Sequence, residues 1–215
     1  MKFFRLHGLS FYRKRAPSFR LRQRFNTHGI KNSIYFIGDL HLDHANIIRY
    51  CHRPFPNVHA MNEALINNWR KSVKDKDIVY FLGDLAFGRN SRSASYWLKH
   101  LSGKITFIKG SHDRGIRKFR KRKTIKHGKY TFVMLHDPAQ ITRRIPKENT
   151  WIIHGHKHNN NIRNYPFING EKKTINVSVE LIDYKPVSLD FLLSLDLDSI
   201  MRMDTIKSKP ERWRH

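Results

Sequence analysis

A carboxylate and an imidazole follow the first strongly apolar segment of this sequence. Residues 34–37 are β-branched or aromatic and stop at Gly38, which is typical of a buried strand, and Asp39 and His41 come just after it. Side chains two positions apart project to the same side of an extended backbone, so these two groups should converge at the end of the strand. Asp and His are common ligands of divalent transition metals. The pair is also typical of a simple turn, because Gly-Asp sequences reverse the chain readily.

The same arrangement recurs after four later apolar segments. Segments 77–82, 105–108, 130–135 and 151–153 each have the composition of a strand. Residues of metal-binding type follow them: Asp84, Ser111 with His112, His136, and His156 with His158. Ligands of α/β proteins gather beyond the carboxyl ends of the strands, so the recurrence favours one shared site over a series of unrelated turns and loop histidines.

The chemistry of this candidate set indicates a pair of metal ions. Two aspartates, at least four histidines and no thiolate suit Zn, Mn or Fe, whereas Ca prefers oxygen ligands alone. The candidate ligands outnumber those of one tetrahedral ion. Two ions that share one carboxylate and lie roughly 3.5–4 Å apart can clamp both the attacking and the leaving oxygen of a displacement at phosphorus.

The elements that must position these residues alternate in the first half of the chain. Apolar residues at helical spacing predict a helix over residues 57–72, and a second helix is predicted over 91–102. Strands that alternate with helices favour an α/β layered fold, and the first strand should be central in its sheet. In the second half a strand at 174–179 follows earlier strands, which favours a second sheet packed on the first.

The charge of the chain is extreme and one-sided. Its 215 residues carry 42 Lys and Arg against 17 Asp and Glu, a formal net charge of +25. Such a field favours polyanions such as nucleotides, nucleic acid or an anionic membrane surface, although a generally basic proteome would produce the same charge. One cysteine, Cys51, excludes an intrachain disulfide and fits a reducing compartment.

Hydropathy gives no sign of a membrane or secretory segment. No apolar run approaches the roughly 18 residues of a membrane span. The N-terminus lacks the continuous apolar core of a secretory signal. We therefore expect a cytoplasmic protein.

The distribution of charge divides the chain into three regions. Residues 1–31 contain no acidic residue and form a basic leader, which we expect to be flexible or to act as a polyanion-binding arm. Residues 32–199 should form the folded domain, and residues 200–215 a basic, frayed C-terminal tail. A second basic cluster spans residues 114–129, after the 111–113 loop, and its first members are candidate contacts for a phosphate-bearing substrate: Arg114, Arg117 and Lys118.

The complete motif series resembles that of the calcineurin-like metallophosphoesterase superfamily. The likeness covers about residues 33–180 and rests on Gly38-Asp39-Leu40-His41, Gly83-Asp84, Gly110-Ser111-His112-Asp113, His136 and Gly155-His156-Lys157-His158. Two further runs resemble the small stand-alone members of phages and microbes: Asp43-His44-Ala45-Asn46-Ile47-Ile48 and Arg53-Pro54-Phe55. The resemblance implies a four-layer α/β/β/α sandwich of the metallo-dependent phosphatase type.

The resemblance also implies a role for each motif residue. The first metal would be bound by Asp39, His41 and His158, the second by His136 and His156, and Asp84 would bridge them. The ions would be Mn, Fe, Zn or Ni. A metal-bridging hydroxide would attack the phosphorus of a phosphate ester, with His112 donating a hydrogen bond or proton to the leaving group and Asp113 orienting His112.

One position departs from the family pattern. The family usually has Asn where this chain has Ser111, and the Asn amide oxygen contacts the second metal. A serine hydroxyl is shorter and is a weaker neutral ligand. We therefore expect Ser111 to hold the second metal less tightly, directly or through a water molecule.

Two functions follow from these observations. The first is a dinuclear-metal-dependent phosphoesterase, either a phosphodiesterase or a phosphatase, and the charge favours nucleotide or nucleic-acid phosphodiesters as substrates. The second is a nucleic-acid-binding protein on the same scaffold with little or no catalysis. The basic segments and Ser111 motivate this alternative, and a steep salt dependence of binding without turnover would distinguish it.

Overall fold

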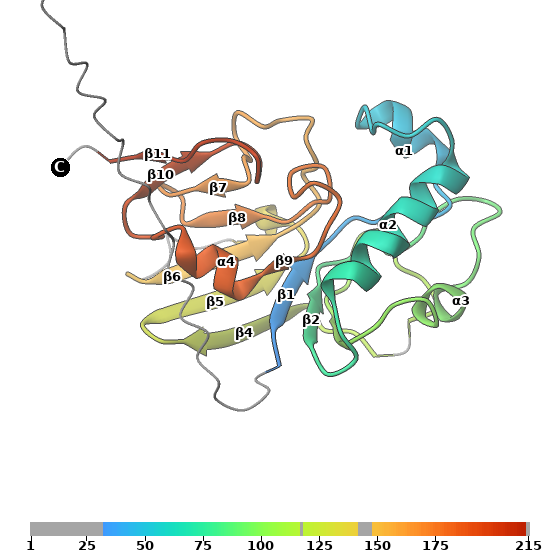
Figure 1. Ribbon diagram of the computed structural model, residues 1–215, viewed down its shortest axis with the longest axis horizontal. Coiled ribbons are helices and arrows are strands. Elements are labelled where there is room, and N and C mark those ends of the chain that lie inside the picture. The colour runs from blue at the N-terminus through green and yellow to red at the C-terminus, as the bar shows by residue number, and fades with distance from the viewer. Residues whose placement is uncertain (1–31, 117, 142–147, 214–215) are drawn as a thin grey trace, which may run out of the picture. The chain divides into compact units, whose positions relative to one another are not determined.

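The computed structural model describes residues 32–116, 118–141 and 148–213 (Figure 1). The predicted leader at 1–31 and the candidate contact Arg117 lie outside these residues. The described part confirms the predicted fold class, since it is a mixed α/β fold with two sheets and few helices. No helix among the described residues is both long and apolar enough to cross a membrane.

The first sheet is short and mostly parallel. Its order is β3-β2-β1-β9, with β1, β2 and β3 parallel and β9 antiparallel to β1. The prediction that the first strand is central is therefore confirmed, because β1 pairs on both sides. The strands are β1 (Ile34–Ile37), β2 (Ile78–Phe81), β3 (Lys104–Phe107) and β9 (Val187–Ser188).

The second sheet is larger and mixed. Its order is β11-β10-β7-β8-β6-β5-β4, and the central strands β5, β6 and β8 run parallel. The strands are β4 (Arg122–His127), β5 (Tyr130–Leu135), β6 (Thr150–His154), β7 (Ile168–Asn169), β8 (Thr174–Asn176), β10 (Ile200–Met203) and β11 (Glu211–Arg212).

Helix α2 (Val58–Ser72) is the long helix of the fold and runs beside β1 and β2 (Figure 1). The Asn57 side chain caps it by accepting a hydrogen bond from the Ala60 N–H at 3.0 Å. Its buried face includes Met61, Leu65 and Trp69, as the helical spacing predicts. The other helices are α1 (Ala45–Tyr50), α3 (Ala94–Leu98), α4 (Leu189–Ser194) and the 3₁₀ turn η1 (Pro138–Gln140).

The core lies between the two sheets. Phe36 on β1 and Phe132 on β5 are fully buried, and their ring centroids are 6.5 Å apart. Side chains alternate along β5, so Val133 and Leu135 point to the opposite face, where they form a small separate cluster with Ile152. One core therefore joins the sheets and fixes how their strand ends meet.

Two local predictions need correction, and one strand was not predicted. The helix predicted at 91–102 is only α3, because Ser93 is extended and caps it. The unpredicted strand is β4 in the basic segment 114–129, and its side chains alternate between exposed and half-buried. This strand lies at the sheet edge, where Lys and Arg are common because they discourage pairing with other chains.

The predicted frayed tail after residue 199 is the second correction. Residues 200–203 form β10, which pairs with β7, and Ile200 is fully buried. Only the first and last residues of β10, Ile200 and Met203, are buried, so the segment lacks the alternation by which a strand is recognised in a sequence. The fold therefore continues into the region that composition assigned to a tail.

Ile200→Ala tests whether this segment belongs to the core. The change should lower the free energy of unfolding by about 2–5 kcal/mol, because it leaves a cavity between packed side chains. Urea denaturation would measure the loss, with the exposed Lys209→Ala as the control. Equal stability of both variants and the wild type would contradict a structural role for the segment.

Candidate metal centre

The ends of six strands meet at one edge of the two sheets. The Asp39 N–H donates to the Gly83 carbonyl at 2.8 Å, which places the segments after β1 and β2 side by side. Across the sheets Gly38 N–H donates to the Val177 carbonyl at 2.9 Å, and within the second sheet Gly155 N–H donates to the His136 carbonyl at 3.1 Å. Residues far apart in sequence are thereby brought into one site, as the strand-end argument predicts.

Two clusters of metal-binding groups lie at this edge. The first cluster consists of Asp39, His41 and His158, and the second of Asp84, His136 and His156. Within each cluster the ligand atoms, one from each residue, all lie within 4.8 Å of one another. The Asp84 Oδ2 atom is 3.5 Å from His41 Nε2 and 3.4 Å from His136 Nε2. It therefore stands between the clusters, where a shared ligand would be.

The backbone of this site is held in an uncommon conformation. Five residues of the site have positive φ angles: 59° at Asp39, 49° at His41, 58° at Asp84, 69° at His156 and 41° at His158. The left-handed region costs an L-residue roughly 1–2 kcal/mol, so packing and hydrogen bonds must hold these residues there.

Two glycines allow the loops to approach the carboxylates closely. A Cβ atom on Gly155 would lie 2.5 Å from Asp39 Oδ2, and one on Gly110 would collide with the Asp84 carboxylate and backbone nitrogen. Any side chain at either position would push the carboxylates away. This explains why glycines precede the motif residues here.

Each of the two aspartates uses one oxygen for structure. Asp39 Oδ2 accepts hydrogen bonds from Ser178 Oγ at 2.7 Å and from the His156 N–H at 2.8 Å. Asp84 Oδ1 accepts one from the His112 N–H at 2.8 Å. Asp39 Oδ1 is buried and has no hydrogen-bond partner among the described residues, so it is available to a cation.

Two histidines likewise have buried ring nitrogens without hydrogen-bond partners among the described residues. His136 Nδ1 lies 2.7 Å from the Leu82 carbonyl, which fixes the ring and leaves a buried Nε2 without a hydrogen-bond partner in the described residues. Both ring nitrogens of His41 are also buried and have no hydrogen-bond partner in the described residues. Buried polar atoms normally find partners, so this set of nitrogen and oxygen donors fits divalent metal ions.

Electrostatics supports the same interpretation. Burial raises the pKa of Asp39 and lowers that of His41 well below its usual value. Burial opposes a charged His136, but the Asp84 carboxylate, 3.4 Å from its Nε2, and the charge of Asp39 raise its pKa to about 9. A proton therefore stays at a position suited to a cation, and a metal ion would have to displace it.

A buried ion pair behind the site was missed by sequence reasoning. Arg53 donates to the carbonyl oxygens of Asp39 and Leu40, each at 2.8 Å, and its Nη2 lies 2.7 Å from Glu180 Oε1. The same Oε1 atom lies 3.0 Å from His158 Nδ1 and so orients this ring. The pair thus supports one cluster through both its backbone and its histidine.

A sequence signal for this pair exists. Glu180 is the only charge in segment 177–182, whose other residues apart from Ser178 are apolar, and the side chains of Arg53 and Glu180 are 0% and 1% exposed. A buried carboxylate requires a partner, so this acid could have been recognised as paired.

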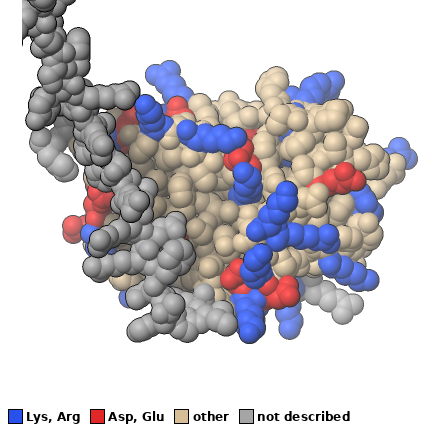
Figure 2. All heavy atoms as spheres, viewed as in Figure 1, with Lys and Arg blue, Asp and Glu red and all other residues tan. Residues whose placement is uncertain are grey.

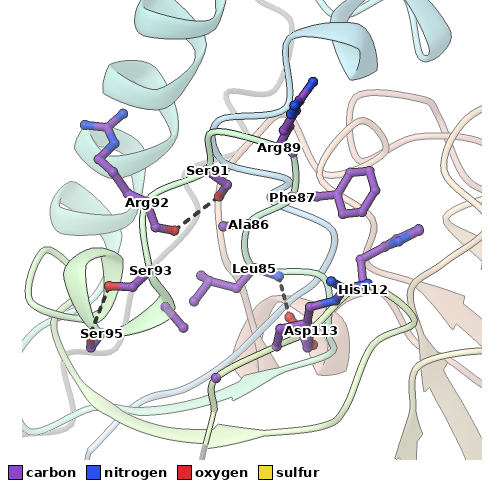
Figure 3. A pocket seen from close by; sticks show the side chains of 14 residues that line it. Leu85, Ala86, Phe87, Arg89, Ser91, Arg92, Ser93, Ser95, His112 and Asp113 are labelled. Carbon is purple, nitrogen blue, oxygen red and sulfur yellow. Dashed lines mark hydrogen bonds between the residues drawn. The ribbon is translucent and has the colours of Figure 1, made fainter.

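Asp113 has a different role from the one predicted. Its carboxylate accepts hydrogen bonds from the N–H groups of Asp84, Leu85 and Gly110 at 3.0, 2.9 and 2.8 Å. It therefore fastens the loop after β2 to the loop after β3, and Figure 3 shows its contact with Leu85. We correct the expectation that it orients the His112 ring.

The remaining predicted residues lie on the 111–120 segment. Ser111 and His112 are exposed, and the His112 ring centroid is 5.7 Å from that of His41. Arg114 lines a hollow beside His112. Lys118 lines a different hollow against β3, so the structure does not bring it together with Arg114.

Comparison with known proteins identifies the family. The sequence profile of the calcineurin-like phosphoesterase superfamily domain matches residues 33–177. The chain belongs to this superfamily. The resemblance found in the motifs is thereby confirmed, and membership indicates metal-dependent phosphoesterase chemistry.

Several relatives share much of the sequence or fold. The uncharacterized protein MJ1445 of Methanocaldococcus jannaschii is 51% identical over 164 residues, which cover 75% of this chain and 90% of that protein. The gene 66 protein of Mycobacterium phage D29 is 32% identical over 87 residues, 39% of this chain and 41% of that protein. The crystal structure of AQ665 from Aquifex aeolicus, a protein of unknown function, is 28% identical with a TM-score of 0.59, covering 77% of this chain and all of that chain.

Glu180→Gln tests the buried ion pair. The change leaves Arg53 buried without a counter-charge and should lower the free energy of unfolding by about 3–5 kcal/mol. Urea denaturation would measure the loss, and the exposed Glu171→Gln is the matched control. A loss no larger than that of the control would show that the pair does not support the fold.

Proposed function

We propose that the protein hydrolyses phosphate esters with the help of two divalent metal ions. The observation that carries the proposal is Asp84 Oδ2, which lies 3.5 Å from His41 Nε2 and 3.4 Å from His136 Nε2 and so stands between the two clusters, where Asp39, His41 and His136 have buried donor atoms without hydrogen-bond partners among the described residues. The first ion would be held by Asp39, His41 and His158, the second by His136, His156 and Ser111, and both by Asp84. The donor types suit Mn, Fe, Zn or Ni.

The reaction adds water across a P–O ester bond. When bound, the ions would lower the pKa of a water molecule and offset the charge of the phosphate. A bond forms between the water oxygen and phosphorus, the P–O bond to the leaving alcohol breaks, the departing oxygen takes up one proton, and the other water proton passes to solvent. His112 is the candidate donor of the proton or hydrogen bond to the departing oxygen, because its exposed ring lies beside His41.

The substrate class follows from charge. Figure 2 shows Lys and Arg side chains spread over one face of the protein, and the net charge of the chain is +25. Such a field raises the local concentration of anions and supports nucleotide or nucleic-acid phosphodiesters as substrates. The buried, free Cys51 supports a reducing, cytoplasmic setting.

Hydrolysis of bis-(p-nitrophenyl) phosphate and p-nitrophenyl phosphate with added Mn²⁺ tests the proposal. Asp84→Ala should lower kcat at least about 100-fold, because loss of even an outer-shell metal partner has effects approaching that size. His112→Ala should lower kcat for an alkyl phosphodiester by about 100-fold or more, and less for p-nitrophenyl esters, whose leaving group needs little protonation.

The exposed His59→Ala on α2 is the control for these variants and should retain full activity. Unchanged turnover in Asp84→Ala would exclude the two-metal mechanism. Salt-sensitive binding of DNA without turnover under any metal would instead support the non-catalytic nucleic-acid-binding protein.

Ser111→Asn tests whether the serine weakens binding of the second metal ion. Wild type should bind the second Mn²⁺ more weakly than the first, and the longer amide of Asn should tighten it by about tenfold, the scale on which ligand-shell changes act. Equilibrium dialysis with metal analysis would measure the stoichiometry, with His156→Ala as the variant that should lose the second ion. Full and equal occupancy in wild type and Ser111→Asn would contradict the prediction.

A further inference from the structure

A hollow of about 490 Å³ adjoins the candidate metal centre on the side of His112 (Figure 3). It is lined by the 85–93 loop together with Ala94 and Ser95 at the start of α3, and by the 112–115 loop after β3. None of the six Asp and His residues of the two clusters is among its lining residues. Its volume is within the range of small-molecule sites, so it can take a group of nucleotide size.

The wall of this hollow is fixed to the metal centre by Asp43. The Asp43 carboxylate accepts hydrogen bonds from the Arg92 backbone N–H at 2.8 Å, from Arg92 Nη2 at 2.6 Å and from Trp97 Nε1 at 3.0 Å. Asp43 is two residues from His41, so the loop that ends at Arg92 is positioned relative to a candidate ligand. The hollow therefore exists before any ligand binds.

Arg92 itself is already engaged. Its guanidinium carbon lies 4.2 Å from the centroid of the Trp97 ring, and Figure 3 shows its side chain directed away from Leu85 and Asp113. Because Asp43 neutralises its charge, Arg92 holds the wall and does not serve as an anion-binding group.

Arg89 and Arg114 supply the free positive charge of the hollow. Both are exposed, one on each loop, and neither forms an ion pair with an acidic residue in the described part of the chain. The acid in the lining, Asp113, has its carboxylate occupied by three backbone N–H groups. Of the serines in the lining, Ser91 Oγ already donates to the Arg92 carbonyl at 3.2 Å, while Ser93 Oγ and Ser95 Oγ lie 2.9 Å apart and share one hydrogen bond, which leaves one hydroxyl proton of this pair for a ligand. This combination suits a phosphate.

The place of His112 connects the hollow with the reaction. The His112 ring centroid is 5.7 Å from that of His41 and 4.3 Å from that of Phe87, which lines the hollow. A leaving group that departs toward His112 would therefore enter the hollow. The ring of Phe87 offers an apolar surface to the part of the substrate between the two phosphates.

We propose that this hollow binds a second phosphate carried by the leaving group of the substrate. The inference rests on the proposed function, since it places the scissile phosphate at the two metal ions. The second phosphate can be joined through a sugar, as in an oligonucleotide, or through an anhydride, as in a nucleoside polyphosphate. Arg89 and Arg114 recognise the shared phosphate chemistry.

Calorimetric binding of adenosine nucleotides to the Mn²⁺-loaded full chain tests the proposal. Wild type should bind adenosine 3′,5′-bisphosphate or ADP about tenfold more tightly than AMP, a gain typical of charge-assisted hydrogen bonds to one further phosphate. Higher affinity than AMP for the bisphosphate alone indicates that the substrate is an oligonucleotide. Higher affinity than AMP for ADP alone indicates that it is a nucleoside polyphosphate. In Arg89→Gln/Arg114→Gln the ratio of affinities should fall to within about twofold.

The control variant removes two charges elsewhere. Lys71→Gln/Lys76→Gln changes two exposed lysines outside the lining and should keep the affinity ratio of the wild type. Equal affinity of wild type for all three nucleotides would overturn the proposal, as would an advantage that survives in Arg89→Gln/Arg114→Gln. Binding and hydrolysis are separate measurements, so absence of bis-(p-nitrophenyl) phosphate hydrolysis would overturn only the proposed function.

Discussion

The close approach of strand ends across two sheets is the constraint on which this structure depends. Gly110 and Gly155 pack directly against the carboxylates of Asp84 and Asp39, and no side chain larger than hydrogen fits there. This contact allows β1, β2, β3, β5, β6 and β8 to deliver polar groups to one place while their apolar residues share one core. Without it the same strands could still pair, but the two aspartates and their histidines would be separated by the width of a side chain.

The second organising principle is the unequal distribution of charge. The chain is strongly basic, yet several of its few acids are concentrated at the site, and Asp39 and Asp84 are among the most buried residues of the protein. Burial alone would favour neutral carboxyl groups. At Asp84 nearby imidazoles and a backbone N–H overcome this effect, and Arg53 does the same for Glu180, whereas at Asp39 burial prevails and raises the pKa. The result is a compact, locally anionic centre for cations inside a protein whose wider field attracts anions.

Much of the fold and most candidate ligands could be predicted because each lies where an apolar run ends, a pattern that the sequence displays directly. Other features could not, because they depend on partners far apart in the chain. The three backbone contacts of Asp113 exist only when the loops after β2 and β3 meet, so its motif position suggested a role toward His112 instead. In β4 only one strongly apolar residue, Ile125, marks the inner face, and the surrounding basic residues conceal the alternation.

The positive φ angles at Asp39, His41, Asp84, His156 and His158 restrict how this centre can evolve. Among residues with a Cβ atom, Asn, Asp and His enter the left-handed region most readily, and β-branched residues are the most strongly excluded. These three types are also good oxygen and nitrogen donors for divalent transition metals. The backbone therefore permits exchange among ligands while resisting their replacement by apolar residues. Such a backbone keeps oxygen and nitrogen donors at this edge of the sheets even where single residues change.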